Sequence, residues 1–311
     1  MNATHFFLLT LALPALLAGC TSKPAGNAGP RPDPAALAEL HPLSAASLRA
    51  LPPEPRETAL PQGVEIRELS FESEAGSRTM RLFLPSAKRD TPRGAVLHLH
   101  GAGREAAAFC AELALRADVA VAMPETPWET AAGDALAAYN HLCTEADRLG
   151  IDPDRICLSG DGVGGLLAVA VAREEFETTG GKPAGLLLFY PLLTLEPDSG
   201  ESWKRYGVGF GLGADEMEHF IAEWIPDPEE RKAVALTDAA AEGMPPTLLV
   251  VAECDILRDG GIGFGSRLRR AGVTVRTLRY NGAIHGFLTR PGLDTFRNRA
   301  VADAASFLVG K

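Results

Sequence analysis

The sequence predicts an α/β fold in which a mostly parallel sheet is covered by helices on both faces. Eight short apolar runs have the length and composition of strands, and longer helical patterns separate most of them. Strands that alternate with helices pair in parallel, and the connecting helices then cover both faces of the sheet. Such sheets carry their sites at the carboxyl ends of the strands, so we look for function there.

The predicted elements follow one another along the chain. The strands are residues 64–71, 79–84, 95–100, 119–123, 155–159, 185–190, 247–252 and 273–278. The helices are residues 104–117, 130–149, 163–176, 260–271 and 293–308. The first two strands are separated by Gly76, which predicts a hairpin ahead of the parallel part of the sheet.

Composition excludes several classes of protein. Hydrophobic residues make up 46% and charged residues 23% of the 311 residues, which is typical of a globular chain and excludes collagen and coiled coil. The chain has 30 Lys and Arg against 40 Asp and Glu, a formal net charge of −10. An acidic chain without a basic stripe is poorly suited to a phosphate backbone, so we expect no nucleic-acid partner.

The N-terminus has the pattern of a signal peptide. The apolar stretch at residues 6–18 is shorter than the roughly 20 residues that a membrane-spanning helix needs. It ends in Leu17-Ala18-Gly19-Cys20, which resembles the lipobox of bacterial lipoproteins. We therefore predict a signal peptide at 1–19, lipidation of Cys20 and a Pro/Gly/Ala-rich tether at 20–34. No Lys or Arg precedes the apolar core, and the alternative is a cleaved secretory signal in which Cys20 is incidental.

The lipobox resemblance also implies a location. Thr21 follows the lipidated position, and in bacterial lipoproteins a residue other than Asp there implies the outer membrane. The body of the protein would then face the periplasm and contact the membrane through its N-terminal lipid only. Disulfides are permitted in that compartment, and the four cysteines Cys110, Cys143, Cys157 and Cys254 leave three pairings open. Their spacing fits no zinc pattern, and Cys157 and Cys254 lie in apolar runs that predict buried side chains.

Two segments interrupt the alternation of strands and helices. They are residues 35–55 and 192–242, and we predict that they form a helical cap on a single domain spanning 35–311. A cap supplies an apolar pocket and excludes water, which suits a small hydrophobic ligand. The second segment carries four aromatic residues, and the alternative is that these only pack it onto the body: Trp203, Phe210, Phe220 and Trp224.

Chemistry-bearing motifs follow four of the predicted strands. The third strand ends in H-G-A-G at 100–103, a small-residue turn whose N–H groups can face a developing oxyanion. The fifth is followed by S-G-D-G-V-G-G at 159–165, a glycine-rich turn placed where a G-x-S-x-G nucleophile elbow would be. E-C-D-I-L-R-D at 253–259 and N-G-A-I-H-G-F at 281–287 follow the seventh and eighth strands. The order of elbow, Asp and His is the one that α/β-hydrolases use.

These motifs resemble the hormone-sensitive-lipase-like family of α/β-hydrolases, the bacterial family IV esterases. The M-P-E-T-P-W segment at 123–128 and the G-I-D-P-D-R-I segment at 150–156 are similar to further segments of that family. The resemblance implies an α/β-hydrolase fold and a Ser-His-Asp site for small or medium acyl esters, with no metal and no cofactor. Asp255 and His285 would be the triad acid and base, and the N–H groups of Ala102, Gly103 and Val163 the oxyanion donors.

The departure from the family pattern that matters most is Gly162, and smaller ones are Ala102 in H-G-A-G and Ile256 after Asp255. Gly162 stands where the family's G-D-S-A-G-G has its nucleophilic serine, and glycine has no side chain that can form an acyl-enzyme. Ser159 and Asp161 are alternative nucleophiles at less suitable positions of the turn, and a water activated by His285 is a third. The glycine also relaxes the strained backbone of the elbow. For Gly164 and Gly165 we expect close packing of helix on strand, because the G-x-x-x-x-G-K-[ST] phosphate-binding pattern is absent.

Two functional classes remain open on the sequence. The first is a carboxylic ester hydrolase whose centre is inactive or severely impaired. The second is a pseudoenzyme that uses the esterase pocket to bind a small molecule without chemistry. Asp255 and His285 favour the first, because a pocket used only for binding has no chemical need for either.

Overall fold

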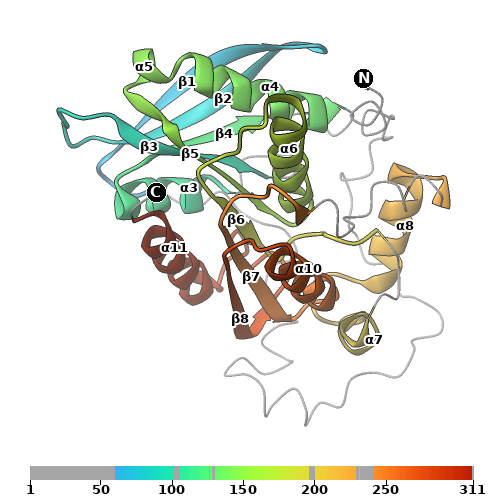
Figure 1. The fold of residues 1–311 in the computed structure, drawn as a ribbon. Coiled ribbons are helices and arrows are strands. Elements are labelled where there is room, and N and C mark those ends of the chain that lie inside the picture. The colour runs from blue at the N-terminus through green and yellow to red at the C-terminus, as the bar shows by residue number, and fades with distance from the viewer. Residues whose placement is uncertain are drawn as a thin grey trace.

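Eight strands form one sheet in the order β1-β2-β4-β3-β5-β6-β7-β8 in the computed structural model (Figure 1). The structure describes residues 60–100, 106–125, 127, 130–195, 200–228, 231 and 241–309. The predicted signal peptide, Cys20, the tether and the cap segment 35–55 lie outside these ranges. Among the described helices, none has the length and apolar character needed to cross a membrane.

All eight predicted strands are present. They are β1 Val64–Ser73, β2 Gly76–Pro85, β3 Arg93–Leu99, β4 Ala120–Glu125, β5 Ile151–Asp161, β6 Leu186–Phe189, β7 Thr247–Cys254 and β8 Val275–Ile284. The hairpin β1–β2 and the pair β2–β4 are antiparallel, and every later pair is parallel. The predicted mostly parallel sheet is therefore confirmed. β8 continues past its predicted end at 278, so that His285 follows the strand directly.

The helices cover both faces of the sheet, as predicted. The helices that connect or follow strands are α3 Ala107–Ala117, α4 Ala131–Thr144, α5 Ala146–Leu149, α6 Val163–Thr179, α10 Arg258–Arg270 and α11 Asp294–Leu308. α3 and α11 contact each other on one face, whereas α4, α6 and α10 lie on the opposite face (Figure 1). The helix predicted at 130–149 is divided into α4 and α5 at Glu145, whose ψ of 6° leaves the helical range.

Burial explains why the central strands appear in the sequence as continuous apolar runs. All eight residues of β7 are buried, and so are six of the seven residues of β3. Strands covered by helices on both faces have no solvent side, so side chains of both orientations enter the core. Cys110, Cys157 and Cys254 are buried and Cys143 is partly buried, and all four thiols are free.

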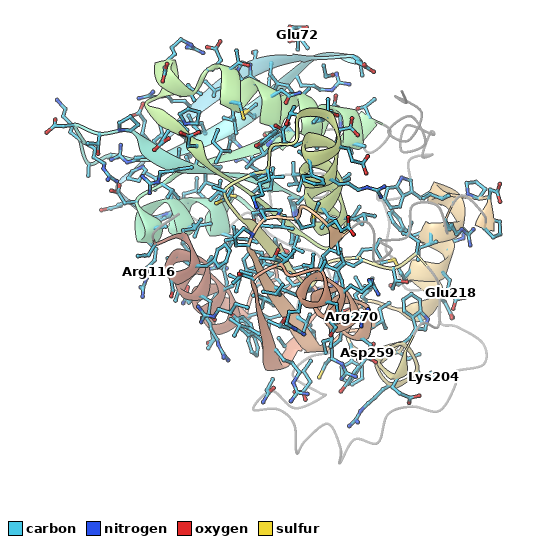
Figure 2. The ribbon with its side chains drawn as sticks, viewed as in Figure 1. Glu72, Arg116, Lys204, Glu218, Asp259 and Arg270 are labelled. Carbon is cyan, nitrogen blue, oxygen red and sulfur yellow. The ribbon has the colours of Figure 1, made fainter. Side chains whose placement is uncertain are left out.

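The insertion between β6 and β7 packs onto the body through its own aromatic residues. It contains α7 Glu201–Tyr206 and α8 Ala214–Trp224. Trp203, Phe210 and Trp224 are buried, whereas Phe220 is partly buried against the core. The backbone N–H of Ser202 donates to Asp259 Oδ2 at 2.9 Å, which ties α7 to the start of α10. Figure 2 labels Asp259. That this insertion also caps a ligand pocket stays a prediction.

Candidate active site

The structure brings together three of the residues that the sequence singles out. Gly162 follows β5, Asp255 follows β7 and His285 follows β8. The carboxyl ends of parallel strands meet along one edge of the sheet, which is why residues so far apart in sequence converge. Asp255 and His285 are in direct contact, and Gly162 faces the other side of the imidazole.

The carboxylate of Asp255 orients the imidazole of His285. Nδ1 of His285 lies 2.9 Å from Oδ2 of Asp255, and the second carboxylate oxygen accepts the backbone N–H of Leu257 at 2.9 Å. The Asp255 side chain is only 1% exposed, so water does not compete for it. When Nδ1–H donates to this carboxylate, neutral imidazole keeps Nε2 as an acceptor. His285 is therefore arranged to take a proton at Nε2.

Gly162 lies at the tight turn between β5 and α6 and has φ 53° and ψ −122°, a conformation that L side chains rarely adopt. Its N–H donates to the carbonyl of Phe189 at 3.1 Å, and its carbonyl accepts the N–H of Leu192 at 2.8 Å. A Cβ built on Gly162 would lie 3.5 Å from His285 Nε2 and 3.7 Å from its Cε1, and no other atom of the described residues would lie within 4 Å. A side chain at position 162 would thus point at the basic nitrogen of His285.

Glycines next to this turn allow helix α6 to approach the sheet. A Cβ on Gly164 would lie 2.0 Å from the carbonyl oxygen of Leu99, and one on Gly165 would lie 2.5 Å from Pro191 Cβ. Real Cβ atoms do not approach other atoms so closely, so only glycine fits at either position. The expected close packing of helix on strand is confirmed.

Of the three predicted oxyanion donors, the structure describes only Val163. Ala102 and Gly103 lie outside the described residues. Val163 is the first residue of α6, directly after Gly162. The N–H groups of a first helical turn have no acceptor within the helix, so α6 itself does not use the N–H of Val163. Its role as an oxyanion donor stays a prediction.

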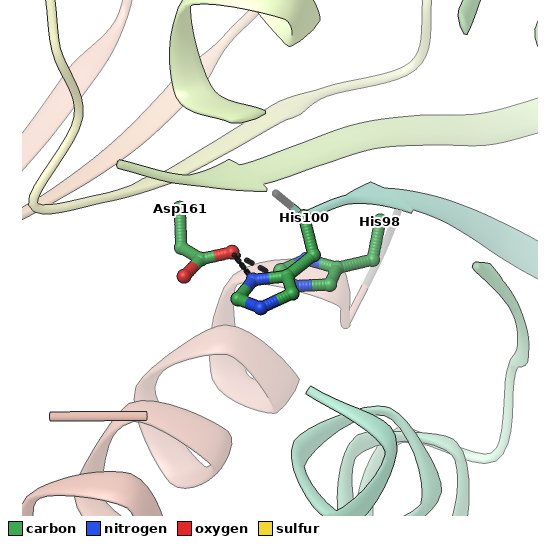
Figure 3. Close-up of side chains that lie close together, drawn as sticks. All are labelled: His98, His100 and Asp161. Atoms are coloured by element: carbon green, nitrogen blue, oxygen red, sulfur yellow. Dashed lines mark hydrogen bonds and ion pairs between the residues drawn. The ribbon is translucent and has the colours of Figure 1, made fainter. Parts of the chain in front are cut away.

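A buried polar cluster that no sequence motif predicts as a unit lies beside the turn (Figure 3). Asp161 Oδ1 lies 2.7 Å from Nδ1 of His100 and 3.4 Å from Nε2 of His98. Tyr190 donates its hydroxyl to Asp161 Oδ2 at 2.9 Å, and Ser159 Oγ lies 3.0 Å from His98 Nδ1. The sequence signal was the alternation H-x-H at 98–100 beside S-x-D at 159–161, because alternate residues of a strand share a face.

Burial and charge set the ionisation of this cluster. Burial by itself raises the pKa of Asp161, but the charges of His100 and His98 and the hydrogen bond of His100 outweigh it and hold this pKa well below its usual range. Burial lowers the pKa of His98. Burial and the neighbouring Asp161 raise the pKa of the Tyr190 hydroxyl, which keeps it a hydrogen-bond donor. The cluster therefore holds an ionised Asp161 in contact with the imidazole of His100 and the hydroxyl of Tyr190.

Ser159 and His98 form a serine–histidine pair, but it lies within the sheet. The two residues are register partners on β5 and β3. Both are 0% exposed. A nucleophile must reach the substrate, and a fully buried hydroxyl between paired strands cannot do so without opening the sheet. The geometry therefore favours a structural role for Ser159.

Tyr190 connects the buried cluster to the imidazole of His285. Its ring packs edge-on against His285 with 4.8 Å between ring centroids, while its hydroxyl bonds Asp161. Tyr190 has φ 36°, which is unusual for a residue other than glycine. The surrounding contacts hold this conformation and fix one wall of the His285 site.

Comparison with known proteins identifies relatives among ester hydrolases. An ethyl acetate hydrolase of Pseudomonas putida is 32% identical over 241 residues, covering 72% of this chain and 76% of that protein. Lipase 2 of Moraxella sp. (strain TA144) is 29% identical over 262 residues, covering 70% of this chain and 60% of the lipase.

Solved structures agree on the fold. EstE1, a carboxylesterase cloned from a metagenomic library, is 27% identical with a TM-score of 0.73, covering 89% of this chain and 96% of its own. A structure from a study of two fungal esterases of Rhizomucor miehei has a TM-score of 0.75 at 24% identity, covering 91% of this chain and 99% of its own. The family model described as "alpha/beta hydrolase fold" matches residues 93–289. The chain belongs to the α/β-hydrolase family, within its lineage of carboxylic ester hydrolases.

Proposed function

We propose that this chain binds small or medium acyl esters between Gly162 and His285 and that its hydrolysis of them is severely impaired. Gly162 occupies the position at which ester hydrolases of this family carry the nucleophilic serine. The observation that carries the proposal is that a Cβ built at position 162 would lie 3.5 Å from Nε2 of His285. The names of the relatives support esters as the substrate class.

The remaining residues support slow chemistry through water. His285, oriented by Asp255, accepts a proton from a water that lies between Gly162 and the imidazole. The oxygen of this water attacks the ester carbonyl. Histidine then returns the proton to the leaving alkoxide. N–H groups of Ala102, Gly103 and Val163 would stabilise the oxyanion. Loss of one triad member leaves about 10³–10⁴-fold acceleration over water in such enzymes, so turnover is expected to be weak.

A side-by-side assay tests the proposal. Hydrolysis of p-nitrophenyl acetate is measured with the natural chain, with Gly162→Ser, and with Gly162→Ser combined with His285→Ala. We expect Gly162→Ser to raise the rate of hydrolysis at least a hundredfold, and the double variant to lose this increase. If Gly162→Ser hydrolyses the ester no faster than the natural chain, the alternative is favoured, namely a pseudoenzyme that only binds a ligand in this pocket.

We also propose that the chain is anchored to the bacterial outer membrane and faces the periplasm. Support comes from the sequence Leu17-Ala18-Gly19-Cys20, from Thr21 after it and from the tether at 20–34. The body would contact the membrane through its lipid only. Its partner would be a small acyl ester or a similar apolar ligand, and its acidic charge of −10 disfavours nucleic acid.

A further inference from the structure

We propose that His98, His100 and Asp161 form a binding site for one divalent transition-metal ion of the zinc class. Each residue offers one ligand atom, and the three atoms lie within 4.8 Å of one another. Figure 3 shows both imidazoles directed at the same carboxylate. The site shares no residue with Gly162, Asp255 and His285, although Asp161 directly precedes Gly162 in the chain.

The ligand set and its spacing suit such an ion. Two imidazoles and one carboxylate form the set that holds zinc in several hydrolases and iron in facial-triad enzymes. Oδ1 of Asp161 lies 2.7 Å from His100 Nδ1 and 3.4 Å from His98 Nε2. An ion at about 2.0–2.2 Å from each ligand atom requires separations of about 3 Å or slightly more. Small side-chain shifts would therefore admit it.

One buried atom of the cluster lacks a hydrogen-bond partner. Nε2 of His98 is fully buried and makes no hydrogen bond within the described part of the chain, although it faces the carboxylate of Asp161. An unpaired buried polar atom is unfavourable. When Nδ1–H of His98 donates to Ser159 Oγ, Nε2 carries a lone pair toward Asp161. A cation between the two would satisfy both groups.

The surroundings have the second layer of hydrogen bonds that metal sites show. The nitrogen of His98 that does not face Asp161 is bonded by Ser159, and the second oxygen of Asp161 accepts the Tyr190 hydroxyl. Metal-binding imidazoles and carboxylates are oriented in this way by outer partners. The His100 side chain is 14% exposed, in contrast to His98, and gives the ion its route of entry. The bound ion would link β3 to β5.

Cobalt binding tests this proposal. The full chain is treated with EDTA, dialysed and titrated with Co²⁺, with visible absorption and metal analysis as readouts and Zn²⁺ as competitor. We expect one Co²⁺ per chain, displaced by one equivalent of Zn²⁺. His98→Phe and Asp161→Asn should abolish binding at one equivalent. Tyr190→Phe, which keeps all three ligands, should weaken it about 10–100-fold.

A surface site serves as the matched control. His219 and Glu223 lie one helical turn apart on α8, 3.2 Å from each other, and could bind cobalt adventitiously. His219→Ala should leave the titration unchanged, and circular dichroism checks the fold of each variant. The proposal is overturned if the natural chain binds no cobalt at one equivalent, or if His219→Ala removes the binding. It is equally overturned if a folded His98→Phe or Asp161→Asn variant binds like the natural chain.

Discussion

Gly162 has backbone angles that cost other residues free energy. With φ 53° and ψ −122°, a serine there would store strain of about 1–3 kcal/mol. We therefore expect Gly162→Ser to lower the free energy of unfolding by that amount in urea denaturation, even as it gains esterase activity. Gly133 in α4 is the control, because no atom of the described residues lies within 4 Å of a Cβ built there and its φ is ordinary. If Gly162→Ser had the same free energy of unfolding as Gly133→Ser, serine at position 162 would not be strained.

Ser159 is expected to matter for stability and not for catalysis. Removing its hydroxyl leaves Nδ1 of His98 unpaired at a fully buried position, at a cost of about 1–3 kcal/mol. In the Gly162→Ser background, Ser159→Ala should lower the free energy of unfolding and leave the kcat for p-nitrophenyl acetate unchanged. If Ser159→Ala removed turnover while the protein stayed folded, Ser159 would be the nucleophile.

At the residue scale, the sequence predicts the strand-end motifs better than the buried groups around them. Gly162, Asp255 and His285 were found because each sits in a short motif directly after an apolar run. For Tyr190 the sequence predicts only the last residue of a strand, since nothing local marks a tyrosine that bonds a carboxylate 29 positions away. Contacts between distant strands depend on register, and register is a property of the whole sheet.

At the element scale, one carboxylate fixes the insertion to the body. Asp259 Oδ2 accepts the N–H of Ser202 in the first turn of α7, and its Oδ1 accepts from Arg258 at 2.8 Å. Losing a capping carboxylate costs about 1 kcal/mol. We expect Asp259→Ala to lower the free energy of unfolding by that amount at pH 7, whereas Glu218→Ala, an exposed residue of α8, should change nothing (Figure 2).

The pH dependence of this contact has a definite sign. Although burial raises the pKa of Asp259, its hydrogen bonds with Arg258 and Ser202 outweigh that effect and lower the pKa in the folded state. A lowered folded-state pKa stabilises the fold above the unfolded value of about 3.9, and the contribution is lost as pH falls further. The difference between the natural chain and Asp259→Ala should be constant from pH 5 to 8 and shrink below about pH 4. A constant difference down to pH 3 would contradict the ionic contribution.

The elements themselves were largely predictable. Buried strands such as β7 show as apolar runs, and the alternation with helices identifies the parallel sheet. The helices of the insertion were not predicted individually, because α7 is short and is held by contacts such as Ser202 with Asp259, 57 positions apart. Short helices depend on tertiary packing more than on their own sequence.

At the scale of the whole molecule, we expect Cys20 to determine where the protein resides. When the full chain is expressed in a bacterium and cells are fractionated, the natural chain should be found with the outer membrane and should incorporate labelled palmitate. Cys20→Ser should release it and abolish labelling, whereas Cys143→Ser, in the body of the fold, should have no effect. Unlabelled natural chain would leave Cys20 incidental to a secretory signal.

The account's central claim is that position 162 is the nucleophile position and faces an intact base. Its most direct test is covalent labelling with diethyl p-nitrophenyl phosphate, which phosphorylates an activated serine with release of p-nitrophenol. Intact mass and peptide mapping should show one diethylphosphoryl group on residue 162 of Gly162→Ser, and no label on the natural chain. A label on Ser159, or none on a folded Gly162→Ser variant, would contradict the claim.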